Sequence, residues 1–336
     1  MQFRHLAAAI LMVSSLRAER IEISWPTPAQ TSPSWRPDID TLQSTASGEP
    51  ETGGFGCVRS NGYRFHEGID IKATKRDSRG EAADEIFAAM DGVVRHINTL
   101  AGESNYGRYI VLEHPDASPQ VYTLYAHLSR IAPGLAQGGH VKRGQVIATM
   151  GRTSGGQAIP RDRAHLHFEI GLFLSRDFQS WFLWKKFGGA NSHGQWNGMN
   201  LMGIDPIDFF HSWQSGKVDT FAQYLAGMQT AVKLRVATTR TPDFLQRYPT
   251  LQTRENPAGL LGGWEIRVNE TGLPFSWTPL EMREVAGMRP NEAIIVDANE
   301  DILRHHHCKT LVDNRHGRKQ IGKDLRTVLE LTLGLR

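Results

Sequence analysis

The sequence has little of several features that would quickly assign a protein to a class. It holds two cysteines, Cys57 and Cys308, which do not form a zinc site by themselves; they fall in different expected domains, so their pairing stays open. The net charge is only +3, and no tract rich in Arg and Lys carries interleaved aromatic residues, so we expect no nucleic-acid partner. No segment is apolar over enough residues to form a membrane-spanning helix.

What is present suits a soluble globular protein of about two domains, with 336 residues of which 40% are hydrophobic and 22% charged. Residues 1–18 are typical of a signal peptide, because Arg4 and His5 precede a short apolar run. We therefore expect export to the periplasm or cell envelope; the alternative is an apolar first element of the fold. Residues 19–52, rich in Pro and Ser, are expected to form an extended arm.

Two histidines lie one residue apart in the stretch from Ala164 to Ile170. Polar and apolar residues alternate there, which is the period of a β-strand and places His165 and His167 on one face. Two imidazoles on one face of a rigid strand can serve one metal site. The alternative is a strand edge that carries two solvated histidines.

A histidine and a carboxylate lie four residues apart, at His66 and Asp70. A catalytic zinc ion usually has three protein ligands and an open position for water, and these two residues with His167 would form such a set. The segment is not the helical His-Glu-x-x-His motif, because its fifth residue is Asp70 and Gly68 weakens a helix. Glu67 is therefore not expected to be a general base. Taken alone, His66 and Asp70 could also be an ion pair in a turn.

A third stretch runs from Val121 to Ser129 and alternates up to His127. A single histidine at the end of a strand is usually structural or solvated. Near a metal site, however, His127 becomes a candidate for proton transfer.

Together these stretches resemble the lysostaphin/LytM-type zinc metallo-endopeptidases, which cut peptide cross-links in bacterial cell walls. The family pattern is His-x-x-x-Asp, Tyr-x-His-Leu-Ser, Val-Lys-x-Gly-Gln-x-Ile and His-x-His. This sequence has all four motifs in that order, at His66–Asp70, Tyr125–Ser129, Val141–Ile147 and His165–His167. The similarity spans roughly residues 53 to 210, about half of the chain.

The resemblance implies one Zn²⁺ per chain, held by His66, Asp70 and His167, with His127 and His165 as the catalytic histidines. It implies a zinc-dependent endopeptidase that hydrolyses peptidoglycan stems or cross-links, or another peptide substrate. The alternative is a non-catalytic relative that binds the cell wall or activates another wall hydrolase. Such relatives usually lose zinc ligands, whereas this sequence retains the full set.

We expect an α+β, mainly β fold. Residues 53–213 would form an antiparallel β-sheet peptidase domain with an open groove, and residues 214–336 a smaller mixed α/β domain of unknown role, with a possible cell-envelope partner. The pair Asp91-Gly92 between two strand-like runs predicts a hairpin. The run from Thr278 to Glu281 predicts the start of a helix.

Two further segments stand apart from the family pattern. The insertion at 172–203 is rich in aromatic residues with partly helical spacing, which indicates a small satellite core or a wall of the substrate groove. The run His305–Cys308 could suggest a metal site, but consecutive side chains point in different directions and rarely bind one ion. We therefore do not expect a native metal there.

Overall fold

The computed structural model describes residues 19–28, 35–315 and 317–335, so the expected signal peptide at 1–18 lies outside the described residues. The fold is mainly β, and the strands pair antiparallel in every sheet of the described residues, as the sequence predicts. In the part of the chain that is described, no helix combines the length and the apolar character needed to cross a membrane.

The larger sheet contains the metal motifs. Its order is β12-β11-β7-β6-β5-β9, with β3 also paired to β11. The strands are β3 (Ile69–Lys72), β5 (Gly92–Asn98), β6 (Tyr109–His114), β7 (Val121–Ala126), β9 (His140–Val141), β11 (His165–Phe173) and β12 (Leu201–Ile204). Along one edge of β11, β3 pairs with residues 165–168 and β12 with residues 170–173, and β7 lies along the other edge. All nine residues of β11 are therefore buried.

Two smaller sheets flank the larger one. β1 (Gly56–Arg59) pairs with β2 (Arg64–His66), and β10 (Val146–Thr149) pairs with β4 (Glu85–Phe87) and β8 (Arg130–Ile131). The hairpin predicted at Asp91-Gly92 is wrong, because β4 pairs with β10 and not with β5. The Asp91 carboxylate instead accepts hydrogen bonds from Lys142 Nζ and Arg143 N, which hold the chain where it passes from one sheet to the other.

The C-terminal half contains a four-stranded sheet of order β15-β14-β13-β16. Its strands are β13 (Val232–Ala237), β14 (Leu261–Val268), β15 (Pro274–Glu281) and β16 (Ala293–Ala298), and a hairpin of β17 (Val312–Arg315) and β18 (Arg318–Ile321) follows. The helix start predicted at Thr278 is wrong, since this residue lies within β15 and pairs with Glu265 of β14. The adjacent Trp277 is fully buried, so packing overrides the local helix signal. A capping box forms three residues later, between Glu281 and Glu284, and begins only a short 3-10 helix.

Six α-helices complete the described structure: α1 (Phe178–Lys185), α2 (Pro206–Gln214), α3 (Phe221–Ala226), α4 (Asp243–Arg247), α5 (Glu300–His305) and α6 (Lys323–Leu333). Short 3-10 helices lie at Ile39–Thr41, Pro50–Gly53, Ala101–Glu103, Arg161–Arg163, Gly194–Trp196, Gly198–Asn200, Pro249–Leu251 and Met282–Val285. The helical spacing of the aromatic insertion corresponds to α1.

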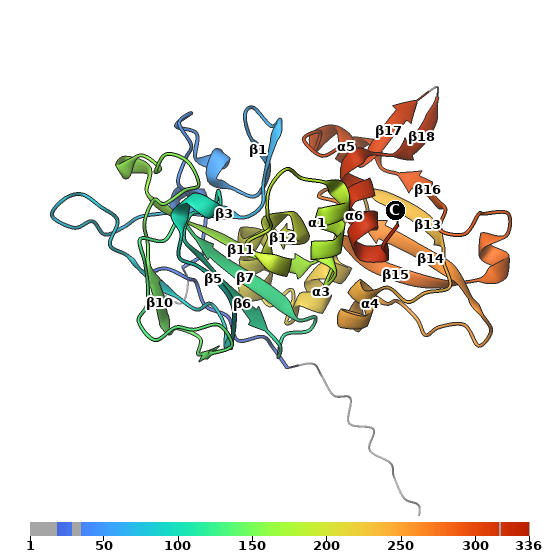
Figure 1. Cartoon of the computed structure of the whole chain (residues 1–336), viewed down its shortest axis with the longest axis horizontal. Coiled ribbons are helices and arrows are strands. Elements are labelled where there is room, and N and C mark those ends of the chain that lie inside the picture. The colour runs from blue at the N-terminus through green and yellow to red at the C-terminus, as the bar shows by residue number, and fades with distance from the viewer. Residues whose placement is uncertain (1–18, 29–34, 316, 336) are drawn as a thin grey trace, which may run out of the picture.

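The two halves lie side by side, with α1 and α6 between their sheets (Figure 1). Trp181 Nε1 and Lys185 Nζ of α1 both donate to Glu330 Oε2 of α6, at 3.0 and 2.9 Å. A disulfide joins Cys57 of β1 to Cys308, across 251 residues of sequence, and so resolves the pairing that the sequence left open. Cys308 is therefore not available to a metal ion.

The N-terminal segments contact the side of the larger sheet's core. Ser24 N donates to Ala89 O at 2.9 Å, and the Trp25 ring packs edge-on against Phe210 of α2 at 5.2 Å between ring centroids. These contacts tie residues before the metal motifs to the core that supports them.

Candidate metal centre and groove

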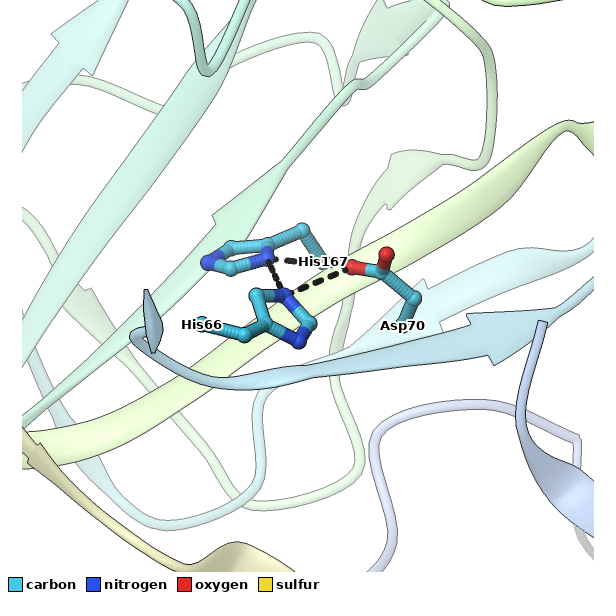
Figure 2. Close-up of side chains that lie close together, drawn as sticks. All are labelled: His66, Asp70 and His167. Carbon is cyan, nitrogen blue, oxygen red and sulfur yellow. Dashed lines mark hydrogen bonds and ion pairs between the residues drawn. The ribbon is translucent and has the colours of Figure 1, made fainter. Parts of the chain in front are cut away.

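Three buried side chains converge at one point of the larger sheet (Figure 2). His66 Nε2 lies 3.0 Å from His167 Nδ1 and 3.1 Å from Asp70 Oδ1, and His167 Nδ1 lies 3.1 Å from the same oxygen. The three atoms thus form a nearly equilateral triangle. His66, Asp70 and His167 are the ligand set that the sequence motifs indicated.

Local backbone geometry brings these residues together. His66 ends β2 and Asp70 lies within β3, so the motif is built on strands and not on a helix. Asp70 is directly paired with His167 across β3 and β11. A Cβ atom at Gly68 would lie only 2.3 Å from Phe168 O, so the glycine is needed for the close approach of this segment to β11.

Hydrogen bonds on the far side of each ring fix which nitrogen faces the triangle. His66 Nδ1 donates to Gly54 O at 2.6 Å, and His167 Nε2 donates to Glu169 Oε1 at 2.9 Å. The remaining ring nitrogens, His66 Nε2 and His167 Nδ1, both face the Asp70 carboxylate, and each can offer a lone pair to a metal ion when its ring is neutral.

The electrostatics of the same residues point to a cation. Burial opposes ionisation of Asp70, but the charges of His165 and His66 and a hydrogen bond from His167 hold the pKa of that carboxyl well below its usual range. Burial also lowers the pKa of His167, yet the carboxylates of Asp70 and Glu169 outweigh it and raise that pKa to about 9. The site therefore stabilises positive charge.

The spacing of the triangle suits a zinc ion. Tetrahedral zinc with nitrogen and oxygen ligands has bonds of about 2.0–2.1 Å, so its ligand atoms are about 3.3–3.4 Å apart. The observed separations of 3.0–3.1 Å differ from this by only a few tenths of an ångström. Two imidazoles and one carboxylate are also a donor set that leaves one coordination position open for water.

The structure brings His127 and His165 to the same centre. The His127 ring centroid lies 4.8 Å from that of His165 and 5.9 Å from that of His167. His127 Nδ1 donates to Thr153 O at 2.8 Å and His165 Nδ1 to Arg163 O at 2.7 Å, so Nε2 is the ring nitrogen of each that can accept a proton. His165 Nε2 lies 3.4 Å from Asp70 Oδ1, the oxygen of the proposed ligand set.

His127 also has an uncommon backbone conformation. Its φ is +60°, in the left-handed region that residues other than glycine rarely adopt. Its N–H donates to Tyr106 O at 2.9 Å, which anchors the turn after β7. Burial, followed by the nearby charges of His165 and His167, holds the pKa of His127 well below its usual value, and burial also lowers that of His165.

Sequence reasoning missed Glu169, which supports the ligand His167 from behind. The Glu169 side chain is fully buried and also accepts hydrogen bonds from Tyr106 Oη at 2.6 Å and Tyr122 Oη at 2.7 Å. The strand period could have found it, because Glu169 lies two residues after His167 and hence on the same face of β11. Its role is to fix the ring and tautomer of His167.

Sequence reasoning also missed Arg59. Its Nη2 lies 2.8 Å from His66 Nε2 and contacts Asp70 Oδ2. Because a guanidinium group only donates, this contact agrees with His66 Nε2 being an acceptor. Arg59 lies at the end of β1, two residues after Cys57, and no sequence signal marked that position.

A groove of about 1090 Å³ runs over the metal centre. Its walls include His127, His165 and His167, and the segment Gln157–Pro160 before β11. Residues of the C-terminal half also line it, and these are Thr271, Lys309, Asp324, Thr327 and Val328. The fold thus defines a β-sheet protein with a buried His-Asp cluster that could hold a metal ion, at an open groove.

Comparison with known proteins identifies the family of this segment. A model of Peptidase family M23 matches residues 64–175, the segment that carries all five of these histidine and aspartate residues. Residues 64–175 are therefore similar to peptidase family M23, which confirms the resemblance drawn from the motifs. A comparison with curated proteins gave no match.

Several solved structures are similar to part of the chain. A chain named as a lytM glycyl-glycine endopeptidase from Ruminococcus gnavus is 26% identical over 46% of this chain and 53% of its own, with a TM-score of 0.31. A zinc-containing peptidase from Vibrio cholerae is 24% identical over 45% of this chain and 33% of its own (TM-score 0.25). The catalytic domain of the antimicrobial peptidase lysostaphin from Staphylococcus simulans is 21% identical over 48% of this chain and 88% of its own (TM-score 0.28). The matched region thus spans about half of the Ruminococcus chain and a third of the Vibrio chain.

Proposed function

We propose that this protein is a zinc-dependent endopeptidase that hydrolyses peptide bonds in peptidoglycan stems or cross-links. The observation that carries the proposal is the triangle of His66 Nε2, Asp70 Oδ1 and His167 Nδ1, with two further histidines beside it in an open groove. The M23 domain supplies the reaction class. One zinc ion per chain would be held by His66, Asp70 and His167.

Zinc held there would polarise the carbonyl of the scissile bond and lower the pKa of a water molecule to about 7. The protein's own residues would move the protons. Burial lowers the pKa of both His127 and His165, and their Nδ1 atoms are engaged by backbone carbonyls, so the Nε2 atom of one can accept the proton of the attacking water and pass it to the leaving amine. Before that transfer, the Nε2–H of the histidine that took the proton of the water can donate a hydrogen bond to the developing oxyanion.

The substrate class follows from the groove and from the relatives. An open groove that passes over the centre suits an extended peptide that enters and leaves along its length. The similar proteins from Ruminococcus and Staphylococcus are named as endopeptidase and antimicrobial peptidase. We therefore propose a wall peptide as the substrate. A protein that acts on the wall would be exported, so we also propose the periplasm or cell envelope as its location. Residues 53–213 and 214–336 are the two domains that we propose for the chain.

The test is digestion of purified wall fragments by the full-length protein, with mass analysis of the products. We expect new peptide termini, loss of cleavage after treatment with a chelator, and recovery with zinc. Binding of wall fragments without cleavage by the zinc-loaded protein would support a non-catalytic wall-binding relative. Cleavage of unrelated proteins but not of wall fragments would show a different peptide substrate.

A further inference from the structure

One lysine of the C-terminal half faces the groove. Lys309 is among the groove-lining residues, and its Nζ lies 4.1 Å from the ring centroid of Phe65, the residue before the ligand His66. In the part of the chain that the structure describes, this ammonium group has no hydrogen bond or ion pair, and the Phe65 ring is its only close partner. Lys309 therefore presents unused hydrogen-bond donors beside the metal centre.

Two anchors fix the backbone on either side of Lys309. The preceding residue, Cys308, is bonded to Cys57 of β1. The following residue, Thr310, donates its N–H to Asp324 Oδ2 at 2.7 Å, at the start of α6. A lysine on a surface loop could swing freely, but this one is held against the groove. The position of the Lys309 backbone is thus set by these two tertiary contacts and not by a local sequence motif.

Charged residues lie near the Lys309 ammonium group, but none of those described forms an ion pair with it. Burial lowers the pKa of Lys309; the negative charges of Glu67 and Asp324 oppose that shift, and Lys323 adds to it. Neither carboxylate is close enough to form an ion pair with Lys309. Lys309 is half-buried and lines the groove, so an anion bound there could accept hydrogen bonds from its ammonium group.

We propose that Lys309 binds a carboxylate of the peptide substrate, and so makes the C-terminal half a part of the substrate-binding site. The proposal deepens the proposed function, on which the identity of the peptide rests. A carboxylate is the anionic group that an unmodified peptide carries, at its C-terminus or on an acidic side chain. Arg64 and Arg163 also line the groove and add to its attraction for such a group.

The experiment measures binding of two probes to the full-length protein by calorimetry, with zinc removed so that no cleavage occurs. The probes are soluble stem peptides from a purified wall, and the same peptides after conversion of their carboxylates to amides. A charge-assisted hydrogen bond predicts that the wild-type protein binds the unmodified peptides roughly tenfold more tightly. A synthetic stem peptide with only its terminal carboxylate amidated then distinguishes a chain end from a side chain.

Three variants locate the effect. Lys309→Met keeps the length of the side chain and should bind both probes equally, at the weaker affinity. Lys309→Arg should retain most of the preference. Lys323→Met is the matched control, because it removes an exposed charge from the same region outside the groove lining and should behave as wild type. Thermal unfolding of each variant checks that it is folded.

The outcomes separate this proposal from the proposed function. Equal binding of the two probes by the wild-type protein, no binding of either, or a preference that persists in Lys309→Met would overturn the role of Lys309. Cleavage of wall fragments by the zinc-loaded protein would still support the endopeptidase. Conversely, a Lys309-dependent preference for the unmodified peptides in a protein that never cleaves wall fragments would support the carboxylate-binding role of Lys309 and contradict the proposed endopeptidase activity.

Discussion

The two halves of the molecule contribute to the groove in different ways. In the first half, the candidate site residues lie on strands within short motifs: Asp70 pairs directly with His167 across β3 and β11, and His66 ends β2, four residues before Asp70. In the second half, Lys309 reaches the groove through a disulfide and a helix start, without a motif around it. The proposed metal site is thus marked by sequence motifs, although its residues come from segments about 100 residues apart, whereas the groove wall around Lys309 is set by tertiary contacts without a motif.

The boundary between the halves is also closely packed. Phe209 of α2 stacks on Phe221 of α3, with ring centroids 4.3 Å apart, and one buried core includes residues of both sheets. Glu330 of α6 accepts two hydrogen bonds from α1. The division at residue 213 therefore stays a prediction about folding units, and the packing across it indicates that their stabilities are coupled.

The largest expected effect tests whether the metal centre depends on the first half alone. His66→Ala, Asp70→Ala and His167→Ala should each lose zinc and all cleavage, because each removes one of only three protein ligands. Zinc content per chain is measured on the purified variants. His140→Ala, which removes an exposed histidine from β9, is the control and should keep zinc. A ligand variant with wild-type zinc content would remove that residue from the proposed set.

A smaller effect is expected for the histidines beside the ligands. His127→Ala and His165→Ala should keep zinc yet lose turnover by about 10²-fold or more, the usual cost of losing a proton-transfer group. The measurements are zinc content and kcat on the same preparations. Near-normal kcat in both variants would leave the proton-transfer assignment without support, even if the ligand set were correct.

The next effect tests the support behind the ligands. Glu169→Gln keeps the shape of the side chain but weakens the acceptor of His167 Nε2–H, and should lower zinc affinity by about 10- to 100-fold. Competition with a chelator of known affinity measures this change. Tyr122→Phe, which removes one of the two tyrosine donors to Glu169, is the comparison and should have the smaller effect. Equal zinc affinity in Glu169→Gln and wild type would make Glu169 a packing residue only.

These predictions reflect how much of the site could be read from the sequence. Strand periodicity and spacing placed His165 and His167 on a strand and His127 at the end of one, and the structure brings all three close to His66 and Asp70. The alternation of polar and apolar residues is a local property of the sequence, so it predicts which side chains share a strand face wherever one face of the strand is buried. Glu169 obeys the same period but was missed, because a buried carboxylate next to a histidine is recognised only once its partners are known.

Other features could not be predicted, because they depend on pairing between distant segments. The Asp91-Gly92 pair has the composition of a hairpin turn, but β4 finds its partner in β10, more than 50 residues later. The helix signal at Thr278 yields to the pairing of β15 with β14, which buries Trp277. Arg59 and Lys309 carry no local signal at all. Arg59 is placed by the pairing of β1 with β2, and Lys309 follows the Cys308 end of the disulfide.

The smallest expected effect on cleavage, and the sharpest test of the comparison, comes from that disulfide. Replacing both cysteines, as Cys57→Ser with Cys308→Ser, removes a cross-link between segments 251 residues apart and should lower the free energy of unfolding by about 2–4 kcal/mol. Zinc content should stay at the wild-type level, because the disulfide supplies none of the three ligands. Cleavage should fall by less than about tenfold at saturating substrate, since the proton-transfer groups are also untouched. The preference for peptides with free carboxylates should weaken, because Lys309 loses one of its two anchors.

Denaturant unfolding with and without a reductant measures the stability change, and the double variant, which should not respond to reductant, is the control. If the reduced wild-type protein instead loses zinc, the C-terminal half supports the metal centre directly, and the separation between a local centre and a tertiary wall fails.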